Sequence, residues 1–208
     1  NKISSDIKAF IDGDDDNSAA GISGISADDI DIGAIDTSSI NAIGGAASVS
    51  AAFGGKVGVA ISVGVSLAEN HISNEVEAYI ARANDTLRTL SGGILIDART
   101  TAKINAITVA ASVAIGGSGK AGIAVSGAGA VAKNIILTRT NAFVRENSII
   151  NSASIVDIDA LSNSSIEAIV VAASVGIGAG GVAGIGASVG FALARNFIGW
   201  DPAASPSD

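Results

Sequence analysis

Large apolar and small residues alternate with a period of two along much of this chain. In residues 57–68 the odd positions carry Val, Ile or Leu, and the even positions carry Gly, Ala or Ser. Because successive side chains of a strand point to opposite faces, the pattern predicts a strand with one aliphatic face and one small-residue face. Neither face carries a charge. We therefore expect both faces to be covered, the small-residue face by a segment that lies very close to it.

The same pattern occurs three times. The block Ala-Ala-Ser-Val begins at Ala46, Ala110 and Ala172, with spacings of 64 and 62 residues. Each block leads into a glycine-rich turn and then into a second alternating run. Self-similarity at a fixed period is typical of repeat arrays. The sequence predicts repeats over residues 1–69, 70–133 and 134–195, followed by the start of a fourth copy and a Pro/Ser-rich linker tail over residues 196–208.

The glycine-rich segments are short enough for hairpin connections, so each repeat is predicted to carry one long antiparallel hairpin. The parity of the large aliphatic positions also shifts within each repeat. In the second repeat Ile96 and Ile104 are even-numbered, whereas Ile107 and Val109 are odd-numbered, and a further shift falls near Asn70. A one-residue slip within a strand is typical of a bulge. We therefore expect bent strands at these places.

Together these patterns predict an all-β fold of three tandem hairpin-bearing repeats of about 64 residues, with long strands in a two-layer or solenoid-like elongated arrangement. Aromatic residues make up only 3% of the chain, and 26 of its 208 residues are Gly. Small side chains bury little apolar area each. The stability of the fold must then come from repetition.

Composition excludes several classes of function. The net charge of −8 leaves little to neutralise a phosphate backbone, so we expect no nucleic-acid partner. Cysteine is absent, which rules out a disulfide framework and a thiolate metal site. The single histidine, His71, belongs to no recognisable arrangement of nucleophile, base and carboxylate. The sequence therefore predicts no enzymatic activity.

Residues 168–194 carry no charged side chain over 27 positions, a length that a membrane helix would need. The equivalent stretches of the other repeats contain Lys56 and Lys120 near their middle, and the period of two favours strands. A membrane hairpin would turn its small-residue face toward a polar lumen, but these faces carry no charge. We therefore expect no membrane contact and keep an oligomeric membrane β-pore as an alternative function.

Asp12, Asp14 and Asp16 alternate in an acidic segment, as carboxylates do at the start of a calcium-binding loop. The glycine at the sixth position of such a loop is replaced by Asn17, and the glutamate at the twelfth by Ser23. A solvated acidic loop is the competing interpretation. The second alternative function is therefore a calcium-dependent adhesive binding module, with calcium at these three aspartates as the one cofactor considered.

The succession of Ile-x-Ala-Ile, Ala-Ala-Ser-Val, a glycine-rich turn and Val-Glu-Ala-Tyr-Ile at residues 76–80 resembles the repeats of very large secreted bacterial surface proteins, the filamentous-haemagglutinin-like or giant repetitive adhesins. The likeness covers residues 1–200 or so. It implies an extracellular or bacterial cell-surface location and an extended β-rich shape. We expect a structural or adhesive repeat module that self-associates head-to-tail into a fibre or stalk, with neighbouring repeats or identical subunits as its partners.

Overall fold

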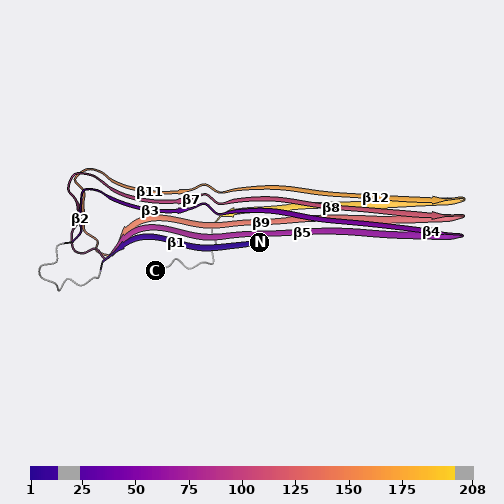
Figure 1. Cartoon of the computed structure of the whole chain (residues 1–208), viewed down its shortest axis with the longest axis horizontal. Helices are drawn as coiled ribbons and strands as arrows, with labels where there is room; N and C mark the ends of the chain where they lie inside the picture. Colours follow the sequence, from indigo (N-terminus) through magenta and orange to yellow (C-terminus); the bar gives the residue numbers. More distant parts are fainter. Residues whose placement is uncertain (14–23, 200–208) are drawn as a thin grey trace.

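The computed structural model describes residues 1–13 and 24–199, and within these residues every regular element is a β-strand. The predicted Pro/Ser-rich tail lies outside the described residues. The elongated shape in Figure 1 confirms the predicted all-β, solenoid-like fold. The strands are β1 (Lys2–Asp12), β2 (Ser26–Ala27), β3 (Ile30–Asp36), β4 (Ser39–Gly54), β5 (Val57–Ala81), β6 (Leu87–Thr89), β7 (Ile94–Thr100), β8 (Lys103–Ser118), β9 (Ala121–Arg145), β10 (Ile150–Asn151), β11 (Val156–Ser162), β12 (Ser165–Gly180) and β13 (Ala183–Gly199).

The strands form four parallel sheets. Sheet A has the order β1-β5-β9-β13, sheet B the order β10-β6-β2, sheet C the order β11-β7-β3 and sheet D the order β12-β8-β4. The chain passes through sheets B, C, D and A in turn and then re-enters sheet B one layer further along. We call one such passage a coil; the coils run over residues 26–81, 87–145 and 150–199. Equivalent residues of successive coils pair with each other, as Ile40, Ile104 and Ile166 do.

The two long strands of each coil turn back on each other but do not form the predicted hydrogen-bonded hairpin. Strand β4 pairs with β8, and β5 pairs with β9, in both cases in parallel. The two long strands of one coil, which we call its arms, therefore belong to different sheets and face each other through their side chains. Pairing between coils lets a strand of the middle coil bond along both edges, which a lone hairpin could not do.

Large aliphatic side chains fill the space between sheets C and A. Ile94 and Ile96 of β7 belong to one buried cluster with Val76 and Ile80 of β5, and none of the four is more than 1% exposed. A second buried cluster, around Ile104, continues this core into sheet D. Here the hydrophobic positions point inward and the intervening positions outward, as in an ordinary two-layer β-fold.

Beyond this core, Ala, Ser and Gly fill most of the interior between sheets D and A, and the larger inward side chains Thr108 and Val170 lie next to the core. Ala114 is fully buried, and the hydroxyl oxygen of Ser112 lies 3.0 Å from that of Ser62 and 2.8 Å from that of Ser126. The sheets approach so closely that a Cβ on Gly122 would lie 2.1 Å from a backbone carbonyl oxygen of sheet D. The small-residue face is thus covered by a closely approaching segment, as the sequence predicted.

The aliphatic face of the same strands is exposed, which overturns the expectation that it would be covered. Along β8 the even positions remain the inward ones from Ile104 to Gly116 without interruption. Ile104 is 0% exposed, whereas Ile107, three residues later, points outward and is 40% exposed. The prediction of a bulge at this parity shift is therefore wrong for β8. The even positions of β8 point inward from Ile104 to Gly116, and the large aliphatic side chains occupy inward positions before Ile107 and outward positions from Ile107 onward.

The change of the large aliphatic side chains from inward to outward positions divides each coil into two parts. We call residues 43–67, 107–131 and 169–193 the distal segment, and the remaining described residues the basal segment. The distal segment consists of one arm from sheet D and one from sheet A, joined by a tight turn at the far end (Figure 1). The basal segment contains sheets B and C, the first residues of the strands of sheet D and the second half of the long strands of sheet A.

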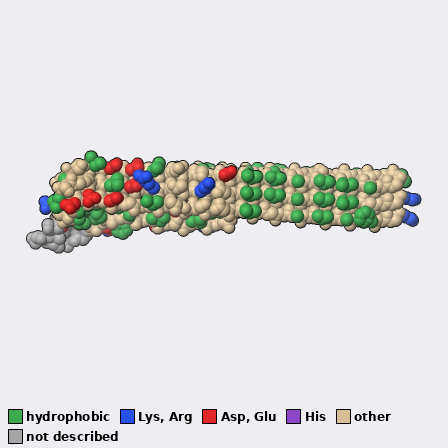
Figure 2. Space-filling view, turned by 45° about the horizontal axis from the view of Figure 1, so that its top comes forward, with side chains coloured by type: hydrophobic (Ala, Val, Ile, Leu, Met, Phe, Trp, Pro, Cys, Tyr) green, Lys and Arg blue, Asp and Glu red, His purple; other side chains and the backbone are tan. Residues whose placement is uncertain are grey.

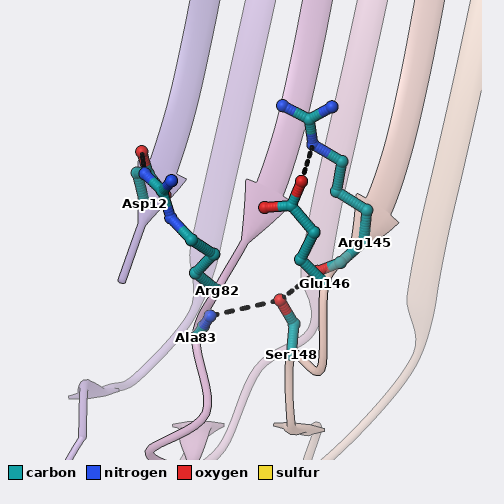
Figure 3. Close-up of polar contacts among 6 residues, drawn as sticks. All are labelled: Asp12, Arg82, Ala83, Arg145, Glu146 and Ser148. Carbon is teal, nitrogen blue, oxygen red and sulfur yellow. Dashed lines mark hydrogen bonds and ion pairs between the residues drawn. The ribbon is translucent and has the colours of Figure 1, made fainter. Parts of the chain in front are cut away.

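A sharp corner ends sheet A where the chain leaves it for sheet B. Arg82 and Glu146 hold the same place in successive coils, and their φ angles are 51° and 55°. This left-handed backbone redirects the chain. Ser148 ties two coils together there, because its hydroxyl accepts a hydrogen bond from the N–H of Ala83 at 3.2 Å and donates one to the carbonyl oxygen of Arg145 at 2.6 Å (Figure 3).

Candidate interaction surfaces

The outer face of the basal segment is charged. On sheet A, Glu75 lies at one register level with Arg139, and the two form an ion pair. One step along, the ammonium group of Lys8 lies 3.3 Å from a carboxylate oxygen of Glu77. Figure 2 shows acidic and basic side chains gathered on this half of the molecule. Ion pairs between strands suit a surface that stays in water.

Two carboxyl groups of the basal segment, Glu75 and Glu69, have lowered pKa values. Partial burial of Glu75 opposes its ionisation, but hydrogen bonds with Arg139 and Glu77 and the charge of Arg139 outweigh it, so the pKa of Glu75 lies below its ordinary value of 4.5. The hydrogen bond and charge of Lys133 lower the pKa of Glu69 in the same direction. Both carboxylates are therefore held in the ionised form by a cation on the next coil.

We expect Arg139→Gln to remove a pH-dependent contribution to stability. A lowered pKa in the folded state stabilises the protein above the unfolded pKa, and this contribution is lost as the pH falls through the folded pKa. The variant should therefore unfold with a free energy about 0.5–1 kcal/mol below that of the unsubstituted chain near neutral pH, and this difference should shrink as the pH falls through the folded pKa of Glu75. Denaturant unfolding at neutral pH and at about pH 3 checks this, and an equal difference at both pH values would contradict it.

Of the three aspartates predicted to bind calcium, the structure describes only Asp12. Asp12 is bound by Arg82, whose Nε donates to Oδ1 at 2.9 Å and whose Nη2 forms a second contact with Oδ2 (Figure 3). Asp14 and Asp16 lie outside the described residues. In residues 1–13 and 24–199, no group of three or more acidic or histidine side chains could hold a metal ion. Calcium binding at Asp12, Asp14 and Asp16 stays a prediction.

The distal segment carries a continuous apolar surface on both of its outer faces. Every outward position of its two arms, in each of the three coils, is Val, Ile, Leu, Phe, Ala or Gly. Figure 2 shows rows of hydrophobic side chains over this half of the molecule. In the first coil the large side chains, all at least half exposed, are Ile43, Val49, Phe53, Val57, Val59, Ile61, Val63, Val65 and Leu67.

Charged residues mark both ends of this apolar surface, which we call the apolar belt. The only charged residues of the distal segment are Lys56 and Lys120, which lie at its turns. At the opposite end, Glu69, Lys133 and Arg195 share one register level, and the ammonium group of Lys133 lies 2.8 Å from the carboxylate of Glu69. The belt therefore begins and ends at charged levels.

The two ends of the stack present open strand edges within the described residues. In the first coil, β4 and the distal half of β5 pair only with the next coil, and in the last coil β12 and β13 pair only with the previous one. Unpaired N–H and C=O groups along such an edge are a template for another strand. Both ends are therefore candidate interaction surfaces.

Comparison of the chain with protein-family models, with curated proteins and with solved structures finds no match. The described residues include no helix with the length and hydropathy that a membrane crossing needs. What the chain does is therefore inferred from its own surfaces.

Proposed function

We propose that this chain is a structural repeat module whose coils stack head-to-tail into a fibre or stalk. The next layer is either a further coil of a longer chain or the first coil of a second copy. The observation that carries this proposal is the pair of open edges, because they present the same parallel strands that neighbouring coils use to pair inside the structure. The resemblance to giant surface proteins adds an extracellular setting and an adhesive role to the proposal.

Side-chain ladders along the stack support growth in this direction. The amide of Asn70 donates to Asn134 at 2.8 Å, and that of Asn134 donates to Asn196 at 2.9 Å, so all bonds run the same way. Asn70 and Asn134 are 0% exposed. A coil added beyond Asn196 could accept from its amide in the same way, because each Asn offers both donors and an acceptor.

The aromatic side chains of sheet A form a second ladder. The rings of Phe10 and Tyr79 stack at 5.1 Å between centroids, and those of Tyr79 and Phe143 stack at 5.0 Å. Both pairs are nearly parallel, with interplanar angles of 8° and 2°. Each added coil can therefore extend contacts between equivalent residues, which is how repeat arrays gain stability.

The open edge of β4 can be blocked by one proline. Backbone groups of successive residues point to alternate sides of a strand, and the carbonyl oxygen of Ser38 accepts from the N–H of Lys103 on β8. The odd-numbered residues of β4, including Ala47, therefore direct their N–H groups to the open edge. Ala47→Pro should remove a donor that stacking needs while leaving the pairing with β8 intact.

We expect the unsubstituted chain to form filaments that lengthen with concentration, and Ala47→Pro to remain as short particles. The measurement is negative-stain microscopy with sedimentation velocity, in a mild non-ionic detergent that covers the apolar belt and suppresses association through it. Strictly monomeric particles of the unsubstituted chain at high concentration, or unchanged filaments of the variant, would overturn the proposal.

Ala173→Pro is the matched control. Ala173 is the equivalent residue of β12. The N–H of Ser165 donates to the carbonyl oxygen of Ala102, so the backbone N–H groups of odd-numbered residues of β12 bond to the neighbouring strand β8 and not to the open edge. This variant should lose stability, because it breaks a bond inside the stack. Ala47→Pro should instead retain the circular dichroism spectrum and unfolding midpoint of the unsubstituted chain.

A further inference from the structure

We propose that the apolar belt of the distal segment inserts into the hydrocarbon of a lipid bilayer. The first observation is that the polarity of this segment is reversed. Its hydroxyl groups point inward, where Ser62 bonds to Ser48 at 2.8 Å and Ser112 to Ser126 at 2.8 Å. Its large aliphatic side chains, apart from Val170 beside Ala110, point outward on both faces. A sheet in water turns its polar positions outward, whereas a surrounding hydrocarbon favours internal satisfaction of polar groups.

The second observation is the length of the belt. Its outward positions run over 11 residues on each arm of the first coil, from Ile43 to Phe53 and from Val57 to Leu67. At about 3.3 Å per residue this amounts to about 36 Å, close to the hydrocarbon thickness of about 30 Å in a typical bilayer. The equivalent positions of the other coils lie in register with these.

The third observation is where the charges lie. Lys56 and Lys120 stand at the turns, and Glu69, Lys133 and Arg195 stand at the other end of the belt. Figure 2 shows basic side chains at the tip, beyond the rows of hydrophobic side chains. Charged residues at both ends with none between them correspond to the two interfaces and the apolar centre of a bilayer.

The backbone of the belt suits this environment. In the middle coil, β8 pairs on both sides with β4 and β12, and β9 pairs on both sides with β5 and β13. Its ladder groups are therefore satisfied within the protein, as hydrocarbon requires. The end coils would meet the same requirement through the stacking proposed above.

The alternation along the strands speaks against a membrane only if the small-residue faces line a lumen, which should be polar. In the structure these faces meet each other, and a Cβ on Gly64 would lie 2.6 Å from the backbone oxygen of Ala111. The interior is a packed core, and the outer faces are the ones available to lipid.

A bilayer fits the belt better than a second copy of the chain. The belt covers both outer faces and ends at the same register level on both arms, so a surrounding medium covers it completely. A copy packed on one face would leave the other face open. Side-by-side copies would also bring basal segments together in a chain of net charge −8, where like charges repel.

Vesicle flotation tests the proposal with the full chain. The chain is diluted from detergent into vesicles of dioleoylphosphatidylcholine, whose zwitterionic headgroups neither attract nor repel its net charge strongly. We expect the unsubstituted chain to float with the vesicles at low and at high salt. Val63→Asp with Val189→Asp, a pair at one register level in the middle of the belt, should reduce the bound fraction at least tenfold, since it places carboxylates in hydrocarbon.

The matched control places two carboxylates on the basal segment instead. Leu90 and Ile155 are 59% and 66% exposed, similar to Val63 and Val189, but they lie outside the belt. Leu90→Asp with Ile155→Asp should float like the unsubstituted chain. Circular dichroism of each variant in detergent verifies that the β-structure is retained.

Fluorescent labels test the depth of insertion, because the chain has no cysteine and accepts a single new one. A nitrobenzoxadiazole label on Val63→Cys should be quenched best by lipids with a spin label deep in the acyl chain. The same label on Lys56→Cys should be quenched best by headgroup spin labels and should be protected from dithionite added outside the vesicles.

Three outcomes would overturn the proposal. Equal flotation of Val63→Asp with Val189→Asp would place the lipid contact elsewhere. Headgroup-level quenching of the label at Val63→Cys would place the belt outside the hydrocarbon. If the unsubstituted chain fails to float and instead sediments, with that sedimentation abolished by the same two substitutions, the belt is an interface between copies. Fibre formation in detergent is scored separately, so failure of either proposal is recognised independently.

Discussion

Replacing Ile40 by alanine should lower the free energy of unfolding by about 2–4 kcal/mol, whereas the same replacement at Ile43 should change it by less than about 0.5 kcal/mol. Both residues lie on β4, three positions apart. Ile40 is 6% exposed and belongs to a buried cluster with Ile72 and Ile104, whereas Ile43 is 85% exposed. Only the first substitution leaves a cavity.

Denaturant unfolding of the two variants, in the same mild detergent, measures this difference. Ile43→Ala is the control for Ile40→Ala, because the chemical change is identical and the strand is the same. Equal losses would mean that both side chains point to the interior. That result would restore the slip in β4 that the sequence suggested and remove the basis for an outward-facing apolar belt.

Gly122→Ala should also be strongly destabilising, by about 1–3 kcal/mol. A Cβ at this position would lie 2.1 Å from the carbonyl oxygen of Ala179 and 2.6 Å from that of Gly116. Both oxygens belong to the backbone of sheet D, so the methyl group can be accommodated only if the two sheets move apart. The substitution therefore tests the close approach of sheets A and D near the turns.

Gly129→Ala is the matched control on the same strand, β9. No atom lies within 4 Å of a Cβ placed there, because this glycine is on the outer face. The free energy of unfolding should stay the same or rise by up to about 1 kcal/mol, since alanine restricts the unfolded chain more than glycine does. A loss as large as that of Gly122→Ala would show that glycine is needed throughout β9 for its backbone rather than for sheet contact.

Repetition made much of the fold predictable. The spacing of 64 and 62 residues between equivalent blocks is the offset at which the strands of successive coils pair. The two-residue alternation of large and small side chains over residues 57–68 predicted a strand there, and β5 confirms it. What the pattern could not reveal was the partner of each strand, because an antiparallel hairpin and two parallel ladders leave the same alternation and the same glycine-rich turn in the sequence.

The candidate surfaces were less predictable. The ion pair between Asp12 and Arg82 joins residues 70 positions apart, so it depends on the register of β1 with β5 and leaves no local signal. The ladder of Asn70, Asn134 and Asn196 is visible as a repeated asparagine. The sequence associated that asparagine with a bend, whereas the structure places Asn70 and Asn134 inside the stack, where their amides bond to each other.

The sequence by itself determined the extended backbone, its two chemically different faces and the repeat length, since all three follow from local alternation and spacing. Only the tertiary structure decided which face is inside. Glycine, alanine and serine let sheets A and D approach almost to backbone contact at positions such as Gly122. Because that space cannot also contain valine or isoleucine, the large side chains of the same strands are left on the outside.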